Sequence, residues 1–232
     1  MPVTSPDSRS TPRGFRAMVP AALWHELLRR GTRRDYRTNE HLLVQGAPGR
    51  SLLVLTAGRV KVVHTDSDGG VLLLALNGPG DLLGEMAARD GGPRSATVVA
   101  LEPCVAYLLT AEAFDHVLRA HGGRAEFDRY FVRKMRGSNQ RTSALAHRSP
   151  RQRLIGLLLE VIELAGEPPE EPVVVPFSQT LLAQALGVSR SLVAQLVAQL
   201  RAEGVLLADR RLLVADLARL RRLAAAADRL TR

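Results

Sequence analysis

The stretch GEMAARDGGPRSA, residues 84–96, places an acid, a base and a hydroxyl around one glycine-rich turn. Strand-like apolar sequence precedes it, and the Gly-Gly-Pro turn brings Arg94 back toward Glu85. An arginine at such a place is costly to bury unless a negative group meets it. Two interpretations follow. Either Glu85 and Arg94 form a structural ion pair, or Arg94 and Ser95 bind an anion from outside the chain.

The sequence around this stretch, over residues 36–109, consists of short runs rich in Val and Leu. Turn signals such as Ala-Gly, Asn-Gly-Pro-Gly and Asp-Ser-Asp-Gly-Gly separate the runs. Short strands at regular spacing with glycine-rich turns are typical of an antiparallel sandwich or barrel. We therefore predict an antiparallel sandwich or barrel here, within a chain of the α+β class.

Helical patterns flank the predicted strands. Residues 20–30 have helical spacing, and Thr110 takes the position of an N-cap for a helix that ends at a Gly-Gly pair. The longer segment 124–147 contains no proline, and apolar or small polar residues recur in it every three or four positions. This seam predicts a helix that pairs with its copy in a second chain, the alternative being that it packs on its own barrel. The seam consists of Phe127, Phe131, Met135, Ser138, Thr142 and Leu145.

A further helix is predicted to begin at Ser149-Pro150 and to end at Gly166, before an acidic, proline-rich connector and a short edge strand. Residues 178–204, SQTLLAQALGVSRSLVAQLVAQLRAEG, then show the spacing of a helix-turn-helix. Ala183 is small where the second helix crosses, Gly187 suits a turn with positive φ, and Val193 is β-branched. A two-stranded wing with Asp209-Arg210-Arg211 at its tip follows. The pattern predicts DNA binding, the alternative being an ordinary three-helix bundle.

The predicted DNA contacts divide into base edges and phosphates. Arg190 suits a bidentate contact with guanine, Gln195 suits adenine or a water-mediated contact, and Ser191 is short enough for a base or a phosphate. Phosphate contacts position the protein and give salt-dependent affinity. The residues expected there are Ser178, Gln179, Ser189, Arg210 and Arg211.

Composition agrees with a polyanionic partner. The chain has 232 residues with 32 Lys and Arg against 23 Asp and Glu, a net charge of +9. Such a balance suits nucleic acid or an acidic membrane face, or else is a solvated basic surface. The single cysteine, Cys104, excludes an internal disulfide and a Cys-ligated cluster, and is expected to be a buried thiol. No run approaches the ~18 apolar residues that span a membrane. We expect a cytoplasmic protein with no metal site, no prosthetic group and no catalytic residues.

The segment GPGDLLGEMAARDGGPRSATV resembles the phosphate-binding cassette of cyclic-nucleotide-binding domains. The run LLVLTAGRVKV with its DSDGG turn, the helix-turn-helix and the order of the elements are similar to the cyclic-AMP receptor protein/Fnr family of bacterial transcription regulators. The resemblance extends from about Leu42 to Leu217. It implies a homodimer that binds a palindromic operator in double-stranded DNA under the control of a cyclic nucleotide. Cyclic AMP is the favoured effector, and RNA polymerase is a further candidate partner.

The resemblance also implies roles for individual residues. Arg94 and Ser95 would hold the phosphate, and Glu85 would accept the ribose 2′-hydroxyl. Backbone N–H groups near Gly84 and Ala96 would add donors, with Met86 and Ala87 in a short turn behind. Alignment through LAHRSPRQRLI puts Ser138 and Asn139 at the positions that meet the base, one from each subunit.

The implied domains are a disordered tail over residues 1–18, a jelly-roll-like cyclic-nucleotide-binding β-roll over 19–121, a dimerisation helix over 122–148 and a winged helix-turn-helix over 149–232. Several alternatives remain open. The regulator is independent of ligand, or it takes cyclic GMP or cyclic di-GMP. A nucleotide-processing enzyme is disfavoured because the cassette has no Walker lysine and no nucleophile–base pair. A module that uses its C-terminal bundle for protein contacts is the remaining alternative.

Overall fold

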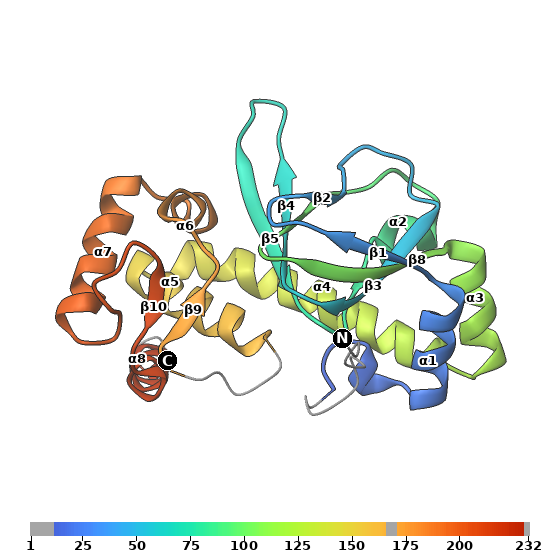
Figure 1. Cartoon of the computed structure of the whole chain (residues 1–232). Helices are drawn as coiled ribbons and strands as arrows, with labels where there is room; N and C mark the ends of the chain where they lie inside the picture. The colour runs from blue at the N-terminus through green and yellow to red at the C-terminus, as the bar shows by residue number, and fades with distance from the viewer. Residues whose placement is uncertain (1–11, 166–170, 230–232) are drawn as a thin grey trace.

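Two four-stranded antiparallel sheets form the N-terminal lobe of this computed structural model, which describes residues 12–165 and 171–229 (Figure 1). One sheet has the strand order β1-β8-β3-β6, and the other has the order β2-β7-β4-β5. The predicted β-roll is confirmed. Its strands are β1 Thr32–Tyr36, β2 His41–Leu43, β3 Ser51–Ala57, β4 Val60–Thr65, β5 Val71–Asn77, β6 Leu82–Leu83, β7 Thr97–Ala100 and β8 Cys104–Thr110.

Apolar side chains from both sheets meet between them, among them Leu53, Leu55, Val98 and Ala106. Cys104 belongs to this core and is 2 % exposed. Burial raises the pKa of its thiol to about 11. The expectation of a buried thiol is therefore confirmed.

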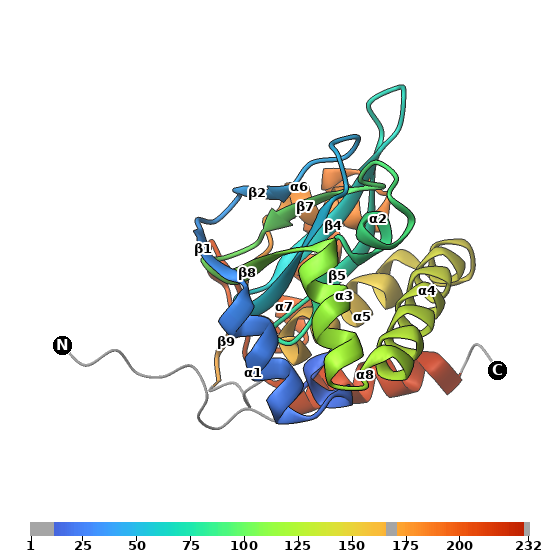
Figure 2. The same ribbon diagram turned by 90° about the vertical axis from the view of Figure 1, so that its right-hand side faces the viewer.

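Helices cover one end of the β-roll. α1, Ala21–Arg30, and α3, Ala111–Ala120, lie side by side there (Figure 2). Thr110 caps α3 as predicted, because its hydroxyl accepts a hydrogen bond from Ala113 N–H at 3.1 Å. A short helix, η1 Arg16–Met18, precedes α1. Phe15 is fully buried beside it, so the predicted tail over 1–18 is wrong for residues 12–18; burying this aromatic ring favours an ordered segment.

The long helix α4, Arg124–His147, has the predicted bounds and leads from α3 toward the C-terminal lobe (Figure 1). Its first half is anchored in its own domain. Phe127 is 3 % exposed and packs edge-on against Phe15 and Phe114. Phe127 therefore belongs to the core of the β-roll lobe and not to the predicted seam, since a ring that fills its own core cannot also face a partner helix.

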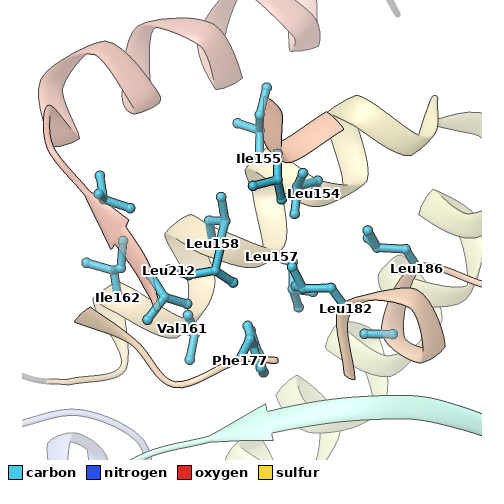
Figure 3. Packing of buried hydrophobic residues seen from close by; sticks show 14 of the residues in the cluster. Leu154, Ile155, Leu157, Leu158, Val161, Ile162, Phe177, Leu182, Leu186 and Leu212 are labelled. Carbon is cyan, nitrogen blue, oxygen red and sulfur yellow. The ribbon is translucent and has the colours of Figure 1, made fainter. Parts of the chain in front are cut away.

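The C-terminal lobe contains α5 Pro150–Glu163, β9 Val173–Val175, α6 Gln179–Leu186, α7 Arg190–Ala202, β10 Leu212–Val214 and α8 Leu217–Arg229. α5 begins after Ser149 as predicted, and Ser149 and Gln152 form a capping box at its start. The predicted stop at Gly166 lies outside the described residues. Side chains of α5 such as Leu157 and Val161 point toward Phe177 and Leu182 in the core of this lobe (Figure 3).

The helix-turn-helix has the predicted form. α6 and α7 are bent by 108° relative to each other, within the range of this motif. Gly187 sits between them with φ +62°, the left-handed conformation for which glycine was expected. Among the described residues no single helix is long and apolar enough to cross a membrane; only α6 and α7 taken together satisfy that test, across their sharp bend.

The predicted wing pairs with an additional strand. β10 forms a two-stranded sheet with β9, and the arm before it pairs with β10 through the bridge between Leu206 and Val214. Two backbone hydrogen bonds of 2.9 Å flank this bridge, from Leu207 N–H to the Leu213 oxygen and from Ala215 N–H to the Val205 oxygen. The predicted two-stranded wing is therefore present, and β9 adds a third strand to it. β9 lies beside β10 and supplies three residues in register, so the ladder forms with this distant strand.

The two lobes share one hydrophobic cluster. Leu73 and Leu76 of the β-roll pack in the same cluster as α5 and α6. Arg59, 7 % exposed, donates to the Val161 carbonyl oxygen at 2.8 Å and forms two hydrogen bonds of 2.7 Å with the Glu102 carboxylate. This contact fastens the end of α5 to the β-roll.

Candidate functional site

A cavity lies between the cassette, β5 and the long helix. All seven predicted cassette residues line it, namely Gly84, Glu85, Met86, Ala87, Arg94, Ser95 and Ala96. Ser138 of α4 lines it as well. Asn139, the other residue predicted to meet a base, is exposed and lies outside this lining. The structure therefore brings eight of these nine residues together around one cavity.

Arg94 is a buried cation held by neutral oxygens. It is 5 % exposed, and it donates to the carbonyl oxygens of Gly84 at 2.8 Å and Ser51 at 2.6 Å, with Ser51 Oγ at 3.2 Å. Burial lowers the pKa of its guanidinium, and the nearby charge of Glu85 opposes that shift. A buried guanidinium supported in this way is positioned for an anion in the cavity.

Gly84 permits the close approach of this arginine. Its φ is +77°, and a Cβ atom there would lie 2.4 Å from an Arg94 nitrogen. Any side chain at position 84 would displace the guanidinium. The glycine at the start of α2, Glu85–Asp90, is therefore required both by backbone conformation and by packing.

Glu85 pairs with a lysine of the long helix. It is 4 % exposed, and its Oε1 lies 2.8 Å from Lys134 Nζ. A structural Glu85–Arg94 pair, the alternative interpretation of the sequence, is not what the structure contains. Glu85 still lines the cavity, so its carboxylate faces both the lysine and the space for a ligand.

The same region of α4 is bonded to the strand before the cassette. Lys134 Nζ donates to the Leu82 carbonyl oxygen at 2.9 Å, and Leu82 N–H donates to the Tyr130 hydroxyl at 3.0 Å. That hydroxyl lies 3.1 Å from Asp81 Oδ1. Complete burial raises the pKa of Tyr130 well above its ordinary value. Tyr130 and Lys134, one turn apart on α4, thus both bond to Leu82 in the strand before the cassette.

Sequence reasoning missed Ser51, Tyr130 and Lys134. Ser51 and Lys134 are each about 40 or more positions along the sequence from the groups they contact, so no local motif predicts these contacts. A signal existed for Lys134, which lies four residues before Ser138 and therefore on the same face of α4.

The eight predicted DNA-contact residues all lie on the surface of the C-terminal lobe, and every one of them is exposed. Ser178 and Ser189 also cap α6 and α7, because their hydroxyls accept from Leu181 N–H at 3.1 Å and Leu192 N–H at 3.2 Å. Ser189 Oγ lies 2.9 Å from Ser191 Oγ. The first two turns of α7 present Arg190, Ser191 and Gln195 on the face opposite the buried Val193 and Leu196.

The wing is held against α7 by Arg201. Its Nε donates to the Leu207 carbonyl oxygen at 3.0 Å, and its second terminal nitrogen donates to the Asp209 carbonyl oxygen at 2.5 Å. Arg211 lies 3.7 Å from the Asp209 carboxylate and is exposed, as is Arg210. The tip is therefore fixed relative to the recognition helix with two arginines facing solvent.

A cyclic-nucleotide-type pocket joined through a long helix to a helix-turn-helix defines a class of ligand-binding transcription regulators. The family models agree with this description. Residues 33–121 match the cyclic nucleotide-binding domain, and residues 152–223 match the Crp-like helix-turn-helix domain. The chain belongs to the CRP/FNR family of transcription regulators.

Curated relatives differ in how much of their length they share. The cyclic AMP receptor protein of Thermus thermophilus is 30 % identical over 75 % of this chain and 78 % of its own length. The CRP-like cAMP-activated global transcriptional regulator of Mycobacterium tuberculosis is 26 % identical over 81 % and 86 %. Acetyltransferase Pat of Mycolicibacterium smegmatis is 36 % identical, but over 44 % of this chain, which spans only 28 % of that protein.

Solved structures show the same architecture. A transcriptional regulator of the CRP family from Thermus thermophilus gives a TM-score of 0.71 with 28 % identity, over 84 % of this chain and 97 % of that one. The c-di-GMP responsive global regulator CLP of Xanthomonas campestris gives 0.70 with 19 % identity, over 85 % and 100 %, which shows a shared fold.

Proposed function

We propose that this chain is a homodimeric regulator whose binding to a palindromic DNA site is controlled by a cyclic nucleotide, with cyclic AMP as the favoured effector. The observation that carries the proposal is Arg94, a buried arginine that lines a cavity and whose guanidinium donates its hydrogen bonds to neutral oxygens. Arg94 and Ser95 would bind the cyclic phosphate, and Glu85 would accept the ribose 2′-hydroxyl. Relatives described as a cyclic AMP receptor protein and as cAMP-activated support this effector.

Dimerisation would use the exposed part of the long helix. Beyond Phe127 the predicted seam continues through Phe131, Met135 and Leu145, which are only half-buried in the single chain. Val132 is 48 % exposed beside them. Covering these side chains with a second copy of α4 would remove apolar surface from water, and would bring Asn139 of one subunit toward the pocket of the other. Sedimentation should give a dimer, and Met135→Asp should give a monomer.

The pocket would act on the DNA-binding lobe through α4. Lys134 contacts both Glu85 and Leu82, so a ribose hydroxyl on Glu85 changes the partners of a side chain on the long helix. A ligand shifts a conformational equilibrium only through such differential contacts. α4 leads into α5 and the helix-turn-helix, whose spacing in the dimer would have to match half-sites about one helical turn apart.

The test is calorimetric titration of the full chain with cyclic AMP, cyclic GMP and cyclic di-GMP, repeated on Arg94→Ala. We expect saturable binding of one nucleotide by the natural protein and its loss in the variant. Arg119→Ala, which removes an exposed arginine of α3, is the matched control and should bind normally. Arg94→Lys keeps the charge without the fork and should bind more weakly.

Other results would redirect the proposal. Binding of cyclic GMP or cyclic di-GMP alone would replace the effector and keep the mechanism. Binding of no nucleotide, with specific DNA binding intact, would favour a ligand-independent regulator. Full affinity in a folded Arg94→Ala protein would refute the assignment of the cassette. Turnover of the nucleotide would favour the alternative of a nucleotide-processing enzyme. We disfavour that alternative because the family consists of transcription regulators.

A further inference from the structure

One wall of the cavity contains a buried amide whose oxygen has no hydrogen-bond partner among the described residues. Asn77, the last residue of β5, is 5 % exposed, and its Oδ1 is buried without a hydrogen-bond partner. Buried carbonyl groups are nearly always paired, because an unpaired one loses its hydrogen bonds to water. The turn at Gly78-Pro79-Gly80 accounts for an asparagine at the end of β5, but it does not account for the unpaired side-chain oxygen.

Along the sheet, Asn77 lies away from Arg94 and Ser95, the residues predicted to bind the phosphate. In the register of the sheet, Val62 lies opposite both Ala75 and Val98, and Asn77 follows two residues beyond Ala75. This direction leads away from Ser95, which precedes β7. The walls between the two ends are apolar, formed by Leu43, Val62, Leu74, Leu83, Val98 and Met135. A site with an anion-binding end, an apolar slot and a polar far wall suits a phosphate, a flat base and the polar edge of that base, in that order.

The far wall contains few polar groups. Asn77, Lys134 and Ser138 line both this cavity and a larger adjoining one between α4, α5 and β5. Lys134 already forms an ion pair with Glu85 and a hydrogen bond to the Leu82 carbonyl oxygen. Asn77 therefore remains as the amide on this wall, and rotation of that amide about χ2 would turn its buried, unpaired Oδ1 toward a ligand in the cavity.

We propose that Asn77 Oδ1 accepts a hydrogen bond from an exocyclic amino group on the purine of the cyclic nucleotide, and so makes this pocket selective for amino-bearing purines. The inference rests on the proposed function, since it concerns the base of the same ligand. The amino group is N6 in cyclic AMP and N2 in cyclic GMP. Cyclic IMP has neither, which makes it the common reference.

The experiment compares the dissociation constants of cyclic AMP, cyclic GMP and cyclic IMP for the full-length protein and for Asn77→Leu. The natural protein should bind one amino nucleotide at least about tenfold more tightly than cyclic IMP, since a site with a buried, unpaired acceptor disfavours the analogue that lacks the donor. In Asn77→Leu this ratio should fall to about one to two, mostly through weaker binding of the amino nucleotide. The nucleotide whose advantage disappears identifies the source of the amine.

Two further variants separate base reading from packing. Asn77→Asp keeps an acceptor and should keep a preference for the amine. Leu74→Val alters the neighbouring apolar wall and should weaken all three nucleotides by a similar factor. Without ligand, Asn77→Leu should melt at a higher temperature than the natural protein, because it removes an unpaired buried oxygen.

The outcomes are distinct. An unchanged ratio in Asn77→Leu, with cyclic nucleotides still bound, would overturn this inference and leave the proposed function standing. The same ratio with a lower melting temperature would assign the amide a structural role and overturn it likewise. If the natural protein binds no cyclic nucleotide at all, the inference falls together with the proposed function.

Discussion

Lys134 carries the positive charge that faces the buried carboxylate of Glu85. Lys134 Nζ lies 2.8 Å from Glu85 Oε1, and the side chain of Lys134 is 19 % exposed while that of Glu85 is 4 % exposed. A carboxylate this deeply buried needs a partner, since removal of one member of a buried pair leaves an uncompensated charge. The lysine therefore serves the stability of the cassette as well as its contact with α4.

The pair can be tested by its removal. Lys134→Met should lower the free energy of unfolding by about 3 kcal/mol in urea titrations, because Glu85 keeps its burial and loses its counter-charge. The double variant Lys134→Met with Glu85→Gln should recover much of that loss. Equal destabilisation of the single and double variants would contradict the ion-pair explanation.

Arg190 is the residue from which we expect sequence discrimination on DNA. It is exposed at the first position of α7, directly after the cap Ser189. Arg190→Ala should cost roughly 1–3 kcal/mol on a specific site and less on random DNA, measured as dissociation constants at fixed salt. Arg210→Ala, at the wing tip, is the comparison. It should weaken binding to both DNAs alike and reduce the salt slope by about one. Equal losses on both DNAs for Arg190→Ala would make it a phosphate contact.

At the level of elements, the turn between α6 and α7 depends on one backbone conformation. Gly187 has φ +62°, and a Cβ atom there would meet nothing within 4 Å. The cost of a side chain is therefore conformational and not steric. Gly187→Ala should lower the free energy of unfolding of this lobe by about 1–2 kcal/mol, the cost of a left-handed L-residue.

A second glycine in the same lobe provides the control. Gly156 lies within α5, its φ is outside the left-handed range, and a Cβ atom there would also meet nothing. Gly156→Ala should stabilise the lobe by about 0.5–1 kcal/mol. If both variants changed the melting temperature in the same direction, backbone conformation would not be the cause.

Local chemistry made most of the elements predictable. The cap predicted at Thr110 is confirmed, and the structure shows the same chemistry at Ser149, Ser178 and Ser189, which are short hydroxyl residues that precede helical patterns. The glycine between α6 and α7 was predictable for the same reason. The pairing of β10 with β9 was not, because strands brought together by a distant connection leave no local pattern.

The candidate site was predictable where it is contiguous in sequence. The cassette residues lie within thirteen positions, and the structure places all seven around one cavity. Lys134, Tyr130 and Ser51 come from other elements, and their role depends on how α4 and β3 pack against the cassette. The roles of these residues toward ligand and DNA stay predictions.

At the scale of the whole molecule, Arg59 connects the two lobes. It binds Glu102 within the β-roll lobe and the Val161 carbonyl oxygen of α5. Arg141 and Glu160 form a second contact between α4 and α5. Together with the shared hydrophobic cluster, these bonds hold the DNA-binding lobe in one orientation.

Removing the first contact should loosen that orientation. In Arg59→Met we expect faster hydrogen exchange in peptides from the end of α5 and from β5, while peptides from α3 exchange as before. Arg30→Met removes an arginine that binds only Glu26 within α1 among the described contacts, and should change neither region. Unchanged exchange at α5 in Arg59→Met would mean that the hydrophobic cluster alone sets the orientation.

The uneven anchoring of α4 has a geometric consequence. Phe127, Tyr130 and Lys134 fix its first half to the β-roll, while the helix continues from Met135 to His147 over a length of about 18 Å, at ~1.5 Å per residue. A tilt of about 10° at the last anchor would carry the far end through about 3 Å, close to the ~3.4 Å rise of one base pair. Under the proposed function, a displacement of this size would be enough to move the helix-turn-helix into or out of register with its half-site.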